Sequence, residues 1–168
     1  MNSNYANSQN LYCGKDATGS RYRIFIRPTD VSTIPSTATL ITAQIRLNCN
    51  LAGSGVYNIY QVTGSWLENV TWSNAPSYST LIDIVTINGV VGTWYTFDIL
   101  DVAKLWLIGS SNYGIIIKTA ESDVDNISFY SSNSATAGNR PIYYFQYNND
   151  KKRKSILLKS SQGGGILL

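Results

Sequence analysis

Alternating apolar and polar residues dominate the chain and predict β-strands. The clearest alternation spans residues 38–50, where Ala43, Ile45, Leu47 and Cys49 occupy one face and polar side chains occupy the other. Shorter alternations and apolar runs predict further strands, most of them bounded by Gly, Asn or Pro. Their ranges are 10–13, 21–27, 56–62, 81–87, 93–99, 113–119, 126–131 and 141–147.

One helical pattern interrupts these strands between Asp98 and Gly109. Asp98 or Asp101 is placed to cap its start, and Gly109 is placed to end it. Its apolar side would consist of Val102, Leu105 and Trp106. A helix this short needs to dock on the rest of the domain to be stable. The pattern therefore predicts an all-β fold with one short helix.

The composition supports one domain of this class. A chain of 168 residues, 43% of them apolar, is long enough for one core and short for two. Charged residues make up only 14%, and Tyr, Ile, Thr, Ser and Asn are abundant, which favours pleated, half-buried surface. We expect the domain to span residues 1–149.

The net charge of +3 comes from the end of the chain. Residues 1–150 hold eight Lys and Arg against ten Asp and Glu, whereas residues 151–168 hold five basic residues and no acid. The body therefore lacks a basic face for phosphate, which argues against nucleic acid as a partner. The basic and glycine-rich composition of residues 150–168 predicts a flexible tail or linker.

No apolar run approaches the roughly 18 residues that cross a bilayer, so no membrane span is expected. The first residues also lack the basic and apolar regions of a signal peptide. If the chain works outside the cell, we expect it to be a domain of a longer exported protein or to leave by another route.

The residues that commonly carry catalysis are scarce. The chain has no histidine, which excludes Ser-His-Asp and Cys-His arrangements. Glu68 and Glu121 are its only glutamates, and no spacing of carboxylates suggests a glycosidase pair. No glycine pattern fits a nucleotide-binding unit. These absences argue against an enzyme.

Metal and redox chemistry have weak candidates. Asp123 and Asp125 form an oxygen-rich cluster that could hold calcium, although acid-rich turns are commoner without metal, and no other cofactor is expected. Cys13 and Cys49 each occupy an apolar position of a predicted strand. They are expected either as buried free thiols or as a disulfide.

An aromatic-rich stretch, residues 64–78, fits neither the strand nor the helix period. A connection of this length keeps a fixed shape when its indole rings pack into the domain. Trp66 and Trp72 are therefore interpreted as core anchors, with a ligand platform as the alternative.

The same stretch carries the motif Trp66-x-Glu68-x-x-Thr71-Trp72-x-Asn74-x-Pro76. The order continues downstream with Phe97-Asp98-Ile99, Asp101-Val102, Trp106, Asn112-Tyr113-Gly114-Ile115 and Arg140-Pro141. These motifs resemble the DNRLRE-type domain of bacterial and archaeal surface proteins, which overlaps carbohydrate-binding modules that include alginate binders. The resemblance covers roughly residues 4–147.

This resemblance implies an antiparallel β-sandwich of the jelly-roll kind and, for some relatives, sugar binding. It also implies a first strand before residue 4 that this chain lacks, which would leave an open sheet edge. Such an edge favours self-association.

Two functions remain: a non-catalytic carbohydrate-binding module, or a structural or adhesive spacer of a larger surface protein. Both would act at the cell surface or outside the cell. The expected partner is a polysaccharide, and an acidic one could be gripped by Arg21, Arg23 and Arg27, which could equally serve only to keep a strand surface soluble. Aromatic rings would stack on sugar while polar groups orient its hydroxyls. The candidate residues are Tyr57, Tyr60, Trp66, Glu68, Asn74 and Tyr78.

Overall fold

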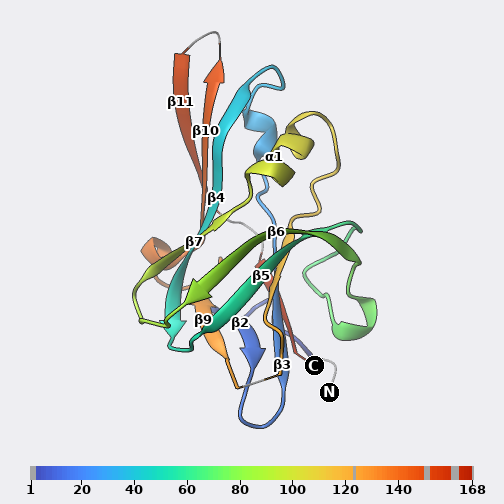
Figure 1. Ribbon diagram of the computed structural model, residues 1–168, viewed down its shortest axis with the longest axis vertical. Helices are drawn as coiled ribbons and strands as arrows, with labels where there is room; N and C mark the ends of the chain where they lie inside the picture. The colour runs from blue at the N-terminus through green and yellow to red at the C-terminus, as the bar shows by residue number, and fades with distance from the viewer. Residues whose placement is uncertain (1–2, 123, 150–151, 160–162, 168) are drawn as a thin grey trace.

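The computed structural model describes residues 3–122, 124–149, 152–159 and 163–167 (Figure 1). Its strands are β1 (Ser3–Asn4), β2 (Asn10–Lys15), β3 (Arg21–Ile26), β4 (Thr39–Leu51), β5 (Gly55–Val62), β6 (Tyr78–Ile87), β7 (Trp94–Asp98), β8 (Ile115–Lys118), β9 (Ile127–Tyr130), β10 (Ile142–Asn149), β11 (Lys152–Lys159) and β12 (Gly163–Leu167). Its helices are α1 (Leu100–Leu107) and the 3₁₀ turns η1 (Val31–Thr33), η2 (Trp72–Asn74) and η3 (Ala137–Asn139).

The strands form one hydrogen-bonded sheet that curls on itself. Its order is β11-β10-β4-β9-β2-β3-β8-β5-β6, while β7 pairs with β4, and β12 pairs with both β1 and β3. The strand pairs are antiparallel. We call the group β4, β7, β10 and β11 the β4 layer, and the group β3, β5, β6, β8 and β12 the β3 layer. The expected all-β, jelly-roll-like fold is confirmed.

The core lies between the two layers. The inward residues Ala43, Ile45, Leu47 and Cys49 of β4 are fully buried, as their alternation predicts. Phe129 of β9 makes edge-on ring contacts to Tyr95 and Phe97 of β7. A large apolar area is thereby removed from water, and this burial is the main favourable contribution to folding.

Helix α1 docks against β4 where the sequence places a helix. The backbone N–H of Leu100 donates to Asp98 Oδ1 at 2.7 Å, and Ile99 N–H donates to Ala43 O at 2.9 Å. Val102 and Trp106 are buried, whereas Leu105, expected on the same side, is exposed. Within the described residues, no helix has the length and apolar character needed to cross a membrane.

The two cysteines are free and buried. Cys13 on β2 pairs with Ile127, and Cys49 on β4 pairs with Phe129, so β9 separates the two thiols. Two strand spacings amount to about 9.5 Å between backbones, which exceeds the roughly 7 Å that a disulfide can span. Burial raises the pKa of the Cys13 thiol well above its usual value, and the charges of Asp125 and Glu121 add to this effect.

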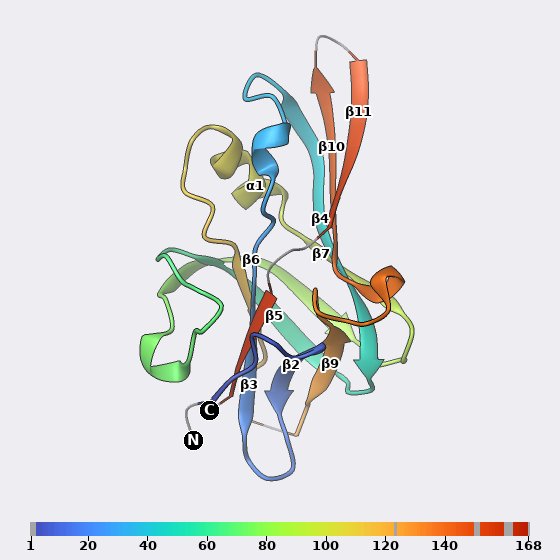
Figure 2. The same cartoon turned by 180° about the vertical axis from the view of Figure 1, so that it is seen from behind.

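Residues 152–159 and 163–167 form strands, which corrects the expectation of a flexible tail. β11 pairs with β10 along its length, and β12 lies along β3, as Figure 2 shows. The Lys- and Gly-rich composition gave no sign of these strands. They form by main-chain hydrogen bonds to a sheet edge, and such pairing does not depend on side-chain type. β12 also covers an edge of β3. Self-association through another edge stays a prediction.

Ile156 and Leu158 of β11 pack against the core, whereas Leu157 between them is 65% exposed. Ile156→Ala and Leu158→Ala should each lower the free energy of unfolding by about 1–2 kcal/mol, because each removes partly buried apolar contacts. Urea denaturation measures this loss, with Leu157→Ala as the matched control. Equal, negligible effects of all three variants would show that β11 is dispensable, as a flexible tail would be.

Candidate functional site

A loop of residues 63–77 joins β5 to β6 and is closed at its base. Thr63 N–H donates to Ser77 O at 2.9 Å, and the two hydroxyl groups lie 3.0 Å apart. Asn4 reaches the loop from the N-terminal segment and donates to the carbonyl groups of Glu68 and Val70, each at 2.6 Å. These bonds hold the loop against the outer surface of the β3 layer.

Trp66 fixes the loop to the domain. Its ring is 5% exposed and lies 5.7 Å from the Phe25 ring between centroids, and its Nε1–H donates to Tyr113 O at 2.7 Å. Val62, Val70 and Phe25 form a second small core with it under the loop. The interpretation as a core anchor therefore holds for Trp66.

Trp72 has a different environment. It lies in η2 and is 41% exposed, with the Arg23 guanidinium carbon 4.0 Å from its ring centroid. At this distance the cation is attracted by the electron-rich face of the indole ring. Trp72 therefore covers one face of Arg23 while presenting part of its own ring to solvent.

Arg23 is held from the other side by Glu121. The contacts are bidentate, with Nε to Oε1 at 2.6 Å and Nη2 to Oε2 at 2.9 Å, and both side chains are largely buried. Glu121 has a backbone φ of 59°, a conformation that costs roughly 1–2 kcal/mol for a residue with a Cβ. This strained residue is the one whose carboxylate fixes the orientation of the Arg23 guanidinium group.

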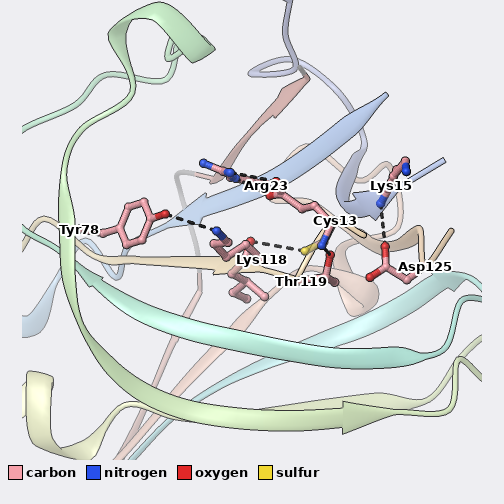
Figure 3. Close-up of polar contacts among 9 residues, drawn as sticks. Cys13, Lys15, Arg23, Tyr78, Lys118, Thr119 and Asp125 are labelled. Carbon is pink, nitrogen blue, oxygen red and sulfur yellow. Dashed lines mark hydrogen bonds and ion pairs between the residues drawn. The ribbon is translucent and has the colours of Figure 1, made fainter. Parts of the chain in front are cut away.

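Lys118 and Tyr78 lie beside this pair. Lys118 Nζ donates to Tyr78 OH at 3.4 Å and lies 5.7 Å from the centre of the Tyr78 ring. Figure 3 shows the two side chains pointing toward each other. The Tyr78 ring packs at 5.2 Å against Tyr60, and both rings are partly exposed. Two tyrosine rings therefore form a wall next to the ammonium group.

The register of the sheet brings the two cations together. β3 pairs with β8 through Ile24↔Ile117 and Phe25↔Ile116, and the same register places Arg23 opposite Lys118. Like charges on directly opposite strand positions repel. Among the described residues, Arg23 has Glu121 as its ion-pair partner, whereas no ion pair involves Lys118. We call Arg23, Lys118, Trp72 and Tyr78 the cationic face.

The structure separates the residues that the sequence singles out. Tyr60 and Tyr78 come together, whereas Tyr57 is fully buried with its hydroxyl donating to Asp125 O at 2.7 Å. The placement of Tyr57 corrects its assignment to a surface site. Tyr57 and Ile59 of β5 face the core. The sequence did not show which face of this strand is buried, because both faces carry aromatic residues.

Glu68 and Asn74 belong to the loop itself. Glu68 is partly buried and bonded to Asn4 through its main chain, and Asn74 Oδ1 accepts the Thr71 backbone N–H in a capping box around η2. A hollow of about 450 Å³ opens on the loop. It is lined by Ser65, Trp66, Leu67, Asn69 and Asn74.

Sequence reasoning did not assign Lys118 or Glu121 to a site, and it gave Trp72 a ligand-binding role only as the alternative to a core anchor. Arg23 carried a signal, because it shares with Arg21 the mostly cationic outer face of a predicted strand. Its pairing with Glu121 spans 98 positions of the chain, and no local pattern reveals such a contact.

The structure describes only one of the two aspartates of the calcium candidate. Asp123 lies outside the described residues, and Asp125 Oδ1 accepts the Lys15 backbone N–H at 2.8 Å. A Cβ on Gly14 would lie 2.6 Å from Asp125 O, so this approach requires glycine. In the part of the chain that the structure describes, no group of three or more potential metal ligands gathers. Asp125 therefore has a structural role.

Comparison with known proteins adds a family. The model of carbohydrate-binding module family 96 matches residues 1–146. No curated protein matches the chain. The match bears out the carbohydrate-binding part of the expected resemblance and does not extend to the DNRLRE-type name.

Arg23→Ala should lower the free energy of unfolding by about 3–5 kcal/mol, because it leaves the buried Glu121 carboxylate without its partner. Arg21→Ala, an exposed change on the same strand, should alter it by no more than about 0.5 kcal/mol. Urea denaturation at neutral pH compares the two. A double variant, Arg23→Ala with Glu121→Gln, should recover part of the loss. Similar stability of the two single variants would contradict a structural pairing.

Proposed function

Because the chain belongs to carbohydrate-binding module family 96, we propose that it binds an anionic polysaccharide at the cationic face, as a non-catalytic module of an extracellular or cell-surface protein. The family supports carbohydrate as the ligand class. The choice of an anionic glycan and of this surface rests on the residues themselves.

The proposal rests on the positions of Arg23 and Lys118, which lie opposite each other on neighbouring strands. Two cations share one outer surface, and Glu121 compensates one of them. The carboxylate of a uronic acid, or a sulfate ester, would supply the second negative charge. Hydrogen bonds between a charged donor and such an anion are about twice as strong as neutral ones.

Aromatic rings flank the two cations. Trp72 and Tyr78 offer flat apolar surface on which a sugar ring can stack, and the capped turn η2 and the contact to Tyr60 hold them in place. Rigid side chains lose little conformational freedom on binding. Asn58, opposite Lys118 on β5, is a further polar group on the same surface.

A structural or adhesive spacer is the alternative function. In that case the Arg23–Glu121 pair and the loop would serve the stability of the domain only. Binding measurements on charge-matched variants separate the two possibilities.

Lys118→Gln should weaken binding to an acidic polysaccharide by roughly ten- to hundred-fold, because it removes a charged hydrogen-bond donor worth about 1.5–3 kcal/mol. Affinity gel electrophoresis in gels containing alginate, pectate or a neutral glucan measures the change. Lys104→Gln is the matched control, because it removes the same charge from an exposed position on α1.

Trp72→Ala extends the same experiment. Because Trp72 is partly exposed, its removal should weaken binding with little change in melting temperature. If Lys118→Gln and Lys104→Gln bind equally, the cationic face is not the site. If the parent is retarded by none of the acidic gels, the spacer function is favoured.

A further inference from the structure

The outer surface of the β4 layer carries a second group of polar and aromatic side chains. β4 lies between β10 and β7 (Figure 1). Arg46 of β4 is opposite Ile142 on one side and Thr96 on the other. Because side chains alternate along a strand, residues paired in this register share the face turned away from the core. The outward group consists of Gln44, Arg46, Asn48, Trp94 and Tyr144, and we call it the β4 face.

Arg46 is the cation of this group and is only partly exposed. Its guanidinium carbon lies 5.3 Å from the centre of the Tyr144 ring, and Nη2 donates to Gln44 Oε1 at 3.1 Å. Its Nε is buried and has no hydrogen-bond acceptor among the described residues. Neutral neighbours thus fix the orientation of the side chain.

No carboxylate compensates Arg46 within the described parts of the chain. Asp98 is the acid nearest in register, since it faces Gln44, and it forms no ion pair with Arg46. Its Oδ1 accepts the Leu100 backbone N–H at 2.7 Å. Arg46 therefore differs from Arg23, whose charge is balanced by Glu121. Partial burial of a cation without a counter-charge is unfavourable, and an anion from outside the chain would relieve it.

Asn48 gives a second, independent sign of an absent ligand. It is 6% exposed, and its Nδ2 donates to Asn139 Oδ1 at 3.3 Å, while its own Oδ1 has no donor within the described residues. Buried polar atoms are nearly always hydrogen-bonded, so each exception calls for an explanation. Trp94 of β7 is the strand partner of Asn48 and is 36% exposed, so it lies next to the unsatisfied oxygen of Asn48.

We propose that the β4 face is a second glycan subsite, in which Arg46 binds the carboxylate or sulfate of an acidic sugar and Trp94 and Tyr144 contact the faces of neighbouring rings. A sugar hydroxyl would donate to Asn48 Oδ1 after a small shift of the side chains that cover it. The ligand class rests on the proposed function, whereas the site rests on residues that the cationic face does not use.

The two subsites lie on separate surfaces. The β4 face belongs to β4, β7 and β10. The cationic face belongs to β3, β8, the start of β6 and the loop before it. β9 and β2 lie between β4 and β3 in the sheet. One chain would then hold two glycan segments or two places on one long polysaccharide. Two linked contacts of modest strength can give much tighter binding to a polymer than to a short oligosaccharide.

Isothermal titration with short ligands tests the second subsite, because a trisaccharide is too short to reach both surfaces. The probes are trisaccharides of galacturonic, glucuronic, mannuronic and guluronic acid, with neutral galactose and mannose trisaccharides as controls. The parent should bind about two acidic trisaccharides per chain and no neutral one. Arg46→Gln should reduce this to about one, at an unchanged melting temperature.

Arg153→Gln is the matched control, since Arg153 is an exposed cation on β11 of the same layer. It should leave the stoichiometry unchanged. Tyr144→Ala provides a second test, which leaves the charge of Arg46 in place. It should lower the affinity of the β4 face for the acidic trisaccharide by roughly five-fold or more, because one stacked ring is lost. Lys118→Gln combined with Arg46→Gln should weaken binding at both surfaces.

The outcomes separate this inference from the proposed function. A single trisaccharide per parent chain that is lost in Lys118→Gln and kept in Arg46→Gln overturns the second subsite and supports the cationic face. A single trisaccharide lost in Arg46→Gln and kept in Lys118→Gln supports the β4 face and overturns the cationic face. No binding of any acidic trisaccharide by the parent overturns both.

Discussion

The bidentate pair between Arg23 and Glu121 organises the surface on which the functional argument depends. Burying two charges costs several kcal/mol, and their attraction roughly offsets that cost, so such a pair is weak support for stability. Its value lies in geometry, because it fixes a guanidinium group under Trp72 and beside Lys118. Glu121 adopts a left-handed backbone conformation in the same arrangement.

The β-sandwich presents two outer surfaces on which cations stand next to aromatic rings. On one, a closed loop anchored by Trp66 brings Trp72 and Tyr78 to the cations of the β3 layer. On the other, Arg46 is oriented by Gln44 and the Tyr144 ring without a loop. Carbohydrate binding requires rigid, flat apolar surface with a few oriented polar groups, and both surfaces meet this requirement.

The sequence predicts the fold better than the site. The alternation along β4 identified its buried face, and Asp98 and Gly109 bounded the helix, because these signals are local. Trp66 and Trp72 share one motif and could not be told apart, since burial depends on what the loop covers. The strands of residues 152–159 and 163–167 were hidden by a linker-like composition. Contacts between distant positions, such as Arg23 with Glu121, leave no periodic trace in the chain.

The most direct test of the central claim is nitrogen-15 NMR of the four tryptophan indole groups during titration with an acidic oligosaccharide. If the glycan binds at the cationic face, the Trp72 indole signal should shift, and this shift should disappear in Lys118→Gln. The Trp66 signal should stay constant, because its Nε1–H is buried and bonded to Tyr113 O. A Trp72 signal that does not move at ligand saturation would contradict binding at this face.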